Sequence, residues 1–132
     1  MTSKVTYLGE LRTSSIHLQS GSEIISDAPL DNNGKGEAFS PTDTVANALA
    51  TCMFTIMGIK ARDMEISLEG STAEVTKTMA ADPRRISKIK VVFNLKSNAD
   101  EKSRELLERV AMRCPVHFSL HPDIEREIIF NW

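Results

Sequence analysis

The feature that most constrains the fold is a helix-forming segment, residues 45–59, that is apolar on almost every side. A helix start precedes it, with Ser40 as N-cap, Pro41 at the first helical position and Asp43 placed to complete a capping box. The helix is expected to run to about residue 60. Because a helix that is apolar all round must be enclosed by protein, the pattern favours a homodimer in which a second copy forms the other wall.

Strand patterns lie on both sides of this helix. Short stretches with β-branched and aliphatic residues, separated by glycine and serine turns, predict a three-stranded meander over residues 4–27, followed by a loop to residue 39. Two alternating stretches around the turn "AADPR" predict a long hairpin, and one further stretch closes the chain. The later strands are expected at residues 64–78, 85–97 and 124–132.

A second helix is expected between residues 97 and 114. Ser97 or Asn98 can cap it, and it should end at Cys114, because Pro115 disfavours helical geometry in the residue before it. A helical turn is expected after Pro115. The order βββ-α-ββ-α-β, without repeat or linker, predicts one α+β domain over residues 1–132, with curved antiparallel sheets around a long central helix.

Charge and composition exclude several classes of protein. The 16 lysines and arginines nearly balance 18 aspartates and glutamates and are scattered among them, so we expect no nucleic-acid partner. The N-terminus shows no signal-peptide pattern and the apolar runs fall short of the ~20 residues that span a bilayer, so we expect no membrane association and a cytoplasmic location. Two cysteines are too few for a disulfide scaffold, which favours a chemical role for them.

Cys52 and Cys114 stand 62 positions apart and lack the close spacing of a structural zinc site. His117 and His121 share a helical spacing, but Pro122 and the short segment disfavour a metal site, so none is expected. For Cys52 two interpretations stay open. It packs as a small hydrophobic residue, or it is a thiolate nucleophile with a second thiol to resolve its oxidised form.

Several motifs occur together in one order along the chain: "SPTD" followed by a cysteine in an alanine-rich helix, the hairpin segment "DPRRISKIKVVF", and a late "CPV". Jointly they resemble the OsmC/Ohr family, the osmotically inducible protein C and organic hydroperoxide resistance proteins, over essentially the whole chain. The resemblance implies an intertwined homodimer. Two long central helices would be sandwiched by sheets from both chains, with two active sites at the interface.

The same resemblance implies a thiol peroxidase of the oxidative stress response. Cys52 would be the peroxidatic cysteine, and Cys114 would condense with its sulfenic acid to a disulfide that an external dithiol reductant reopens. No cofactor is needed. Organic hydroperoxides are the expected substrates, because Met53, Phe54 and Met57 would give the site an apolar lining.

In peroxidase members of the family, an arginine from the N-terminal strands and a glutamate near the start of the cysteine helix hold each other and the thiolate. Arg12 is the only arginine before residue 62 and is the candidate, the alternative being a solvated arginine at a strand edge. Thr42 occupies the glutamate position, and Asp43 is the acidic residue of other branches. Nine residues at about 100° each put Asp43 opposite Cys52, so it either assists the site or serves only the cap, and Glu37 is another carboxylate for the role.

The leading hypothesis is therefore a cysteine-based peroxidase with Cys52, Cys114, Arg12 and Asp43 as site residues. The alternative is a non-catalytic protein on the same fold that binds a small apolar or thiol-bearing ligand. A purely structural role gains little support, since no patterned interaction surface is visible in the sequence.

Overall fold

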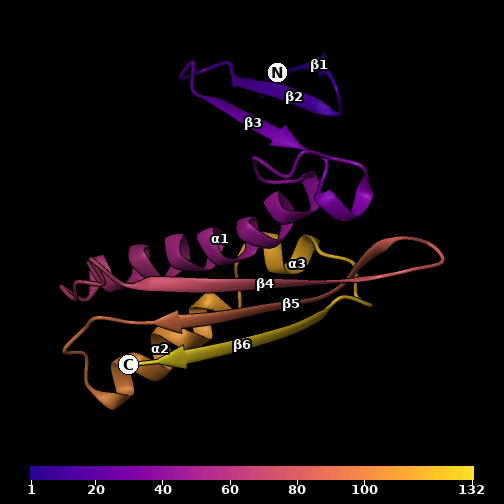
Figure 1. Ribbon diagram of the computed structural model, residues 1–132. Helices are drawn as coiled ribbons and strands as arrows, with labels where there is room; N and C mark the ends of the chain where they lie inside the picture. Colours follow the sequence, from indigo (N-terminus) through magenta and orange to yellow (C-terminus); the bar gives the residue numbers. More distant parts are fainter. The chain divides into compact units, whose positions relative to one another are not determined.

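The computed structural model describes residues 1–132, and its elements follow the predicted order, including the helical turn after Pro115, with one short 3-10 helix added (Figure 1). The elements are β1 (Ser3–Gly9), β2 (Arg12–His17), β3 (Glu23–Asp27), the 3-10 helix η1 (Leu30–Asn32), α1 (Pro41–Asp63), β4 (Thr72–Ala80), β5 (Arg85–Asn94), α2 (Glu101–Ala111), α3 (Pro115–Ser119) and β6 (Glu125–Asn131). The chain divides into two units, Met1–Val45 and Ala46–Trp132, and the boundary falls inside α1. A single domain over residues 1–132 stays a prediction.

The N-terminal unit is built on the predicted meander, an antiparallel sheet in the order β1-β2-β3. Its apolar side chains are largely exposed, with Val5 at 61%, Tyr7 at 64% and Ile24 at 61%. The buried residues of this unit are polar, namely Ser14, Asp27 and Ser40. This unit therefore has no hydrophobic core of its own.

The loop from β3 to α1 folds back on the end of β3. The backbone N–H of Asp27 donates to the carbonyl of Phe39 at 3.2 Å, and Gly36 N–H donates to the carbonyl of Ala28 at 3.3 Å. A Cβ atom on Gly34 would lie 1.6 Å from the Ala28 carbonyl oxygen, so only glycine allows this close approach. The loop thus returns residues 36–39 to the end of β3.

The C-terminal unit contains the sheet β4-β5-β6. β4 and β5 form the predicted antiparallel hairpin, whereas β6 pairs with β5 in parallel, for example Val91 with Ile128. The expectation of purely antiparallel sheets is wrong for this pair. A parallel pair needs a crossover connection, which the helical segment α2–α3 provides here.

Several boundaries also differ from the sequence predictions, and α2 ends at Ala111 and β5 at Asn94, each three residues before the expected end. β4 begins at Thr72 instead of residue 64, because the chain first closes the end of α1 with a turn in which Ile66 N–H donates to the Ala61 carbonyl. The cap of α2 is Asp100 rather than Ser97 or Asn98, and its carboxylate accepts the Ser103 N–H at 2.8 Å.

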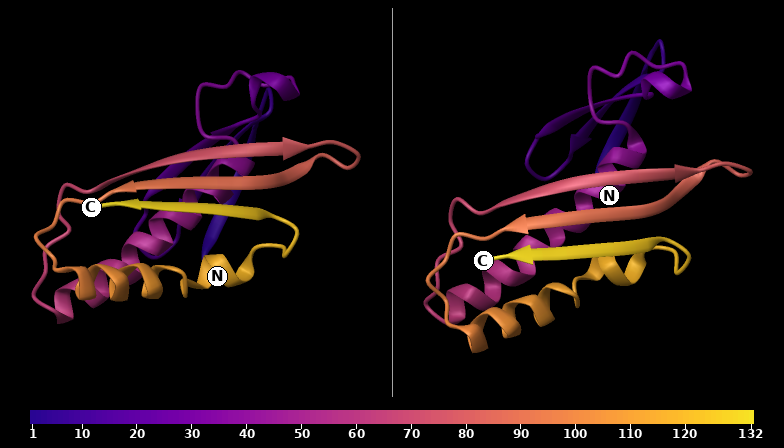
Figure 2. Two further views of the ribbon diagram at one scale, coloured as in Figure 1. Left: turned by 90° about the horizontal axis from the view of Figure 1, so that it is seen from below. Right: turned by 60° about the horizontal axis from the view of Figure 1, so that its bottom comes forward.

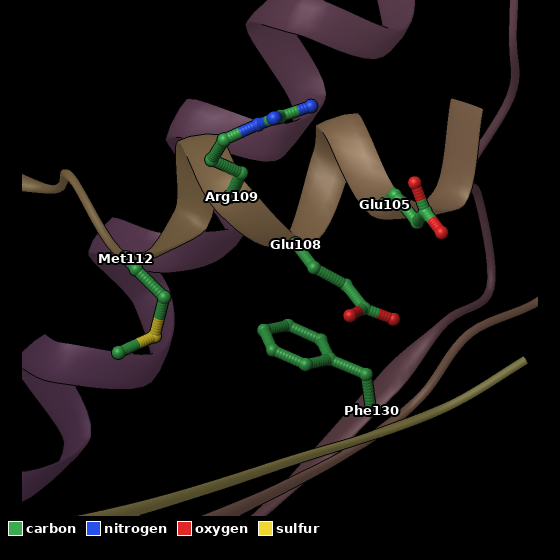
Figure 3. A pocket seen from close by; sticks show the side chains of 5 residues that line it. All are labelled: Glu105, Glu108, Arg109, Met112 and Phe130. Atoms are coloured by element: carbon green, nitrogen blue, oxygen red, sulfur yellow. The ribbon is translucent and has the colours of Figure 1, made fainter. Parts of the chain in front are cut away.

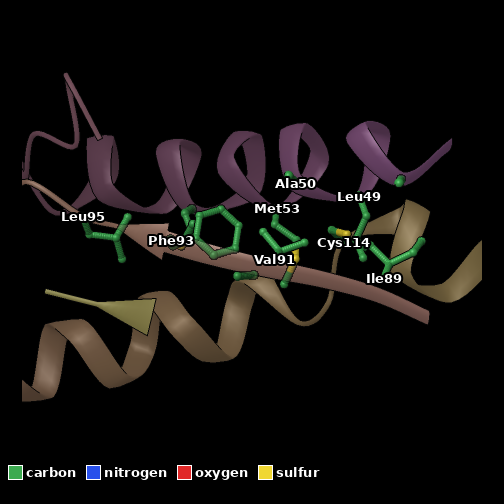
Figure 4. Close-up of a cluster of buried hydrophobic side chains, with 11 residues drawn as sticks. Leu49, Ala50, Met53, Ile89, Val91, Phe93, Leu95 and Cys114 are labelled. Carbon is green, nitrogen blue, oxygen red and sulfur yellow. The ribbon is translucent and has the colours of Figure 1, made fainter. Parts of the chain in front are cut away.

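A single apolar core lies between one face of this sheet and α1 and α2 (Figures 2 and 4). Alternate residues of β5 meet α1 residues spaced by one helical turn, as the two periodicities require. Phe93 is at the centre, with its ring edge-on to Phe54 at 4.8 Å and stacked on Phe130 at 5.2 Å between centroids. The fully buried members include Leu49, Met53, Met57, Ile89, Val91, Phe93, Ala111 and Cys114.

The other side of α1 is open in this chain, with Thr51, Thr55 and Ile59 exposed. α1 has 23 residues and a mean hydropathy of 1.3 over its most apolar window, so by length and composition it could cross a membrane. Core helices of soluble proteins meet the same two criteria. Since Leu49, Met53 and Met57 pack on the sheet, this feature does not place the chain in a bilayer.

Candidate active site

The two cysteines lie next to each other in the C-terminal unit. Cys114 is fully buried in the apolar core and Cys52 packs against that core, close enough for its side chain to help raise the pKa of the Cys114 thiol, although the two are remote in sequence. Both are free thiols. The structure therefore brings together the two residues that the sequence predicted as a reactive pair.

Local geometry sets the environment of Cys114. Pro115 starts the short helix α3 and leaves Cys114 in extended conformation as its N-cap, where Sγ accepts the His117 backbone N–H at 3.3 Å. Burial, the largest influence on this group, raises the pKa of the Cys114 thiol. Cys114 is thus held as a protonated, solvent-shielded thiol at neutral pH.

Cys52 differs from its neighbour by being partly exposed. Its position on α1 lies at the border between the buried side of the helix and the open side. An oxidant arriving from solvent meets Cys52 before Cys114. Of the apolar residues expected to line the site, Met53 and Met57 are fully buried in the core, and Phe54 alone keeps some exposure.

Arg12 begins β2 and is held by two carboxylates of the N-terminal unit. Its Nε and Nη2 donate to Asp27 at 2.7 and 2.8 Å, and Nη2 also donates to Glu37 at 2.7 Å. The hydrogen bonds from Arg12 lower the pKa of Asp27, and the two carboxylates raise the pKa of Arg12. Arg12 is therefore an ion-paired rather than a free solvated arginine, and its role in catalysis stays a prediction. Glu37, which the sequence offered as a carboxylate that could fold over the site, is paired with Arg12.

Asp27 was missed by the sequence reasoning. It lies directly opposite Arg12 in the β2–β3 register. The meander, once predicted, holds a signal for Asp27. A basic residue begins one strand and an acidic residue ends the next, and opposite charges that face each other across two strands attract.

Asp43 and Ser40 form the predicted capping box. Ser40 N–H donates to Asp43 Oδ2 at 2.9 Å, and Asp43 N–H donates to Ser40 Oγ at 3.1 Å. This confirms the cap. Any part that Asp43 plays in catalysis stays a prediction, as do the catalytic roles of Cys52, Cys114 and Arg12.

The two histidines that share a helical spacing do not converge. His121 interacts with Asp123, its Nδ1 lying 3.7 Å from the carboxylate and accepting the Asp123 N–H. His117 is half-buried, and its Nδ1 makes no hydrogen bond. Burial, aided by the Arg126 charge, lowers the pKa of His117.

A groove of about 360 Å³ lies between α2 and β6 (Figure 3). Glu108 reaches toward the ring of Phe130 within it, and the Glu108 carboxylate accepts the Trp132 indole N–H at 2.7 Å. The groove is lined by Glu105, Glu108, Arg109, Met112 and Phe130. Neither cysteine is part of its wall.

The chain was compared with models of protein families and with curated protein sequences. The model of the OsmC-like protein family matches residues 34–128. No curated protein sequence matches the chain.

Solved structures give the same result. A protein from Psychrobacter arcticus 273-4, provisionally named as an osmotic stress induced and detoxification response protein, is 59% identical and superposes with a TM-score of 0.96 over 99% of this chain and 96% of its own. An organic hydroperoxide resistance protein OsmC from Legionella pneumophila is 18% identical, with a TM-score of 0.72 over 100% and 98% of the chains. One from Elizabethkingia anophelis is 14% identical, with a TM-score of 0.74 over 99% and 96%. The last two show the shared fold.

Proposed function

Because this chain belongs to the family of OsmC-like proteins, we propose that it is a thiol peroxidase that reduces organic hydroperoxides to alcohols. The observation that carries the proposal is the contact between a partly exposed Cys52 and a buried Cys114. The names of the structural relatives from Legionella pneumophila and Elizabethkingia anophelis, which refer to organic hydroperoxide resistance, support the class of substrate.

In the first step the Cys52 thiolate attacks the terminal oxygen of the hydroperoxide. A sulfur–oxygen bond forms, the oxygen–oxygen bond breaks, and the alkoxide takes a proton and leaves as the alcohol. Cys52 is thereby oxidised by two electrons to a sulfenic acid. Its partial exposure suits it to this role, because the peroxide must reach the sulfur.

In the second step Cys114 attacks the sulfenic sulfur. The disulfide forms and the sulfenic oxygen leaves as water with the Cys114 proton. An external dithiol then reduces the disulfide by thiol–disulfide exchange and is itself oxidised. The contact of Cys114 with Cys52 suits it to condense without a large rearrangement, and its burial protects it from direct oxidation.

Arg12 is the group that we assign to promote the first step. A free thiol near pKa 8.5 is only a few percent thiolate at neutral pH, and a guanidinium beside it favours the charged form. Arg12 is well suited, because its two carboxylate partners fix it in place. Asp43 contributes through the capping box that starts the cysteine helix.

We further propose a cytoplasmic homodimer. Its support is the open side of α1 and the exposed apolar residues of the N-terminal sheet, such as Tyr7 and Ile24, which a second copy would cover. Light scattering at micromolar concentration should give twice the mass of one chain. A monomeric mass contradicts this part of the proposal.

The enzymatic proposal is tested by the consumption of cumene hydroperoxide in the presence of a dithiol. Cys52→Ser should abolish turnover. Without the dithiol, Cys114→Ser should still consume one equivalent of peroxide but accumulate a sulfenic acid in place of a disulfide. Equal turnover of the wild type and Cys52→Ser would contradict the proposal.

A second candidate function is the binding of a small ligand without catalysis. The groove between α2 and β6 is the observation in its favour, since its volume is in the range of small-molecule sites. The two functions are separated by adding one equivalent of peroxide and titrating the thiols. Two unreactive thiols would favour the binding protein.

A further inference from the structure

Arg126, near the start of β6, donates hydrogen bonds to main-chain carbonyls. Its Nη1 donates to the carbonyl of His117 in α3 at 3.1 Å. The other acceptors lie between α3 and β6, where Nε donates to the Ile124 carbonyl at 3.0 Å and Nη2 donates to the carbonyls of His121 and Pro122 at 3.3 and 3.4 Å. Because the guanidinium is a rigid planar fork, these bonds fix the end of α3 and the chain after it in one arrangement.

α3 is a short segment that needs such an anchor. It has five residues, none of them fully buried, and a helix of this length is not stable by itself. Apolar packing holds it only in part, through Val116 and its C-cap Leu120, which lie partly buried against the core. Arg126 adds hydrogen bonds at the C-terminal end of α3, where carbonyls lack partners within the helix and a positive charge is favourable.

The residue of α3 that Arg126 holds also contacts Cys114. The N–H of His117 donates to Cys114 Sγ at 3.3 Å, while its carbonyl accepts from Arg126. Arg126 lies beside Ile89 in the β5–β6 register, on the sheet face where Ile89 is buried. Ile89 and Cys114 belong to the same buried cluster (Figure 4). Hydrogen bonds therefore connect the sheet, through Arg126 and His117, to the sulfur of Cys114.

We propose that Arg126 is the positioning residue for Cys114, and that by tying α3 to β6 it holds the buried thiol where it meets the oxidised Cys52. The inference rests on the proposed function, because it concerns the second step, in which Cys114 attacks the sulfenic sulfur. Arg126 acts through α3 and is not itself a catalytic residue. Arg126, α3 and both cysteines lie in the same unit, Ala46–Trp132.

A positioning role predicts that loss of Arg126 slows one chemical step and spares the other. Without the guanidinium, the carbonyls turn to solvent, α3 loosens, and Cys114 meets the sulfenic acid of Cys52 less often. The attack of Cys52 on the peroxide comes earlier and does not need Cys114, so its rate should stay the same. A residue that only stabilised the unit as a whole would slow both steps alike when removed.

The experiment follows the wild type and Arg126→Met by rapid quench after one equivalent of cumene hydroperoxide, without a dithiol. Intact mass distinguishes the sulfenic acid, trapped with dimedone, from the disulfide, which is two hydrogens lighter than the reduced chain. We expect Arg126→Met to form the sulfenic acid at the wild-type rate and the disulfide about tenfold or more slowly. Arg126→Lys keeps the charge but not the planar fork, so its disulfide rate should lie between the two.

The matched control is Arg85→Met. Arg85 also donates to main-chain carbonyls, those of Ala81 and Pro83 at 3.0 and 2.9 Å, but in the turn between β4 and β5. Its removal should leave the rates of both steps unchanged. Slowing of the disulfide step in Arg85→Met to the same extent as in Arg126→Met would overturn the assignment to Arg126.

A second oxidant separates this inference from the proposed function. Diamide takes two hydrogens from a pair of thiols, is reduced to the hydrazine and leaves a disulfide without a peroxide step. If Arg126 positions Cys114, Arg126→Met should form the disulfide with diamide more slowly than the wild type. A wild type whose Cys52 is not oxidised by cumene hydroperoxide would overturn the proposed function, and the diamide rates then decide the positioning role by themselves.

The remaining outcomes concern the inference alone. Where the wild type reacts with the peroxide, a wild-type rate of disulfide formation in Arg126→Met would overturn the positioning role, and so would equal slowing of both steps. If circular dichroism shows that Arg126→Met does not fold, Arg126→Lys takes its place. A slower disulfide step with unchanged formation of the sulfenic acid in that variant supports positioning, because the charge is kept, and wild-type rates of both steps overturn it.

Discussion

The interactions that stabilise the N-terminal unit differ in kind from those that stabilise the C-terminal unit. The C-terminal unit has a continuous apolar core around Phe93, whereas the N-terminal unit buries only polar residues and contains the Arg12–Asp27 ion pair. Apolar burial is non-directional and involves no titrating group, while ion pairs are screened by salt and depend on pH. The same chain thus combines a robust unit with one that responds to its surroundings.

The difference matches the chemistry that we assign to each unit. The thiols must meet repeatedly in a fixed geometry, and both lie in or against the apolar core. The proposed activating charge must be held in place, and an ion-pair network on a small sheet provides this. Segments with few buried apolar contacts open locally more easily, so local opening is expected first in the N-terminal unit.

The largest expected effect is in the C-terminal core. Phe93→Ala should lower the free energy of unfolding by about 3–5 kcal/mol, because it removes a fully buried ring that contacts Phe54 and Phe130. Urea denaturation followed by circular dichroism measures the loss. A loss below about 1 kcal/mol would break the comparison, since the core would then not be what stabilises this unit.

The next effect concerns pH and the N-terminal unit. Arg12 lowers the pKa of Asp27 in the folded chain, so the ion pair stabilises this unit above the unfolded pKa of an aspartate, about 4, and the stabilisation is lost as pH falls through the lower folded pKa. Amide hydrogen exchange, corrected for intrinsic rates, should show β2 and β3 losing protection in acid before β5. Asp27→Asn should reduce this pH dependence. Equal acid sensitivity of both sheets would contradict the account.

The smallest effect concerns the helix that joins the two units. Ser40→Ala removes the side-chain cap of α1 and should cost about 1 kcal/mol of stability. Lys102→Ala at an exposed position of α2 is the control and should change stability by less than about 0.5 kcal/mol. If thermal unfolding showed the same stability for both variants, the capping box would have no energetic importance.

Much of the fold could be predicted because local patterns specify it. The capping box needs only Ser40 and Asp43, three residues apart, and the extent of α1 follows from its cap and its unbroken apolar character. The parallel pairing of β6 could not be predicted in this way. It depends on how α2 and α3 carry the chain across the sheet, which no short-range pattern encodes.

The residues of the candidate site also differ in whether a local sequence pattern identifies them. Cys52 and Cys114 were found because cysteine is rare in this chain and both lie in a recognisable family pattern. Asp27 was not found, because its meaning depends on the β2–β3 register that places it opposite Arg12. For the same reason the sequence offered Asp43 and Glu37 as carboxylates and could not rank them.

The most direct test of the account is the fate of the two thiols after one equivalent of an organic hydroperoxide without reductant. Thiol titration and intact mass should show both thiols lost together and a mass two hydrogens lower, the signature of a disulfide between Cys52 and Cys114. Two thiols that stay reactive, or oxidation of Cys114 while Cys52 stays reduced, would contradict the central claim.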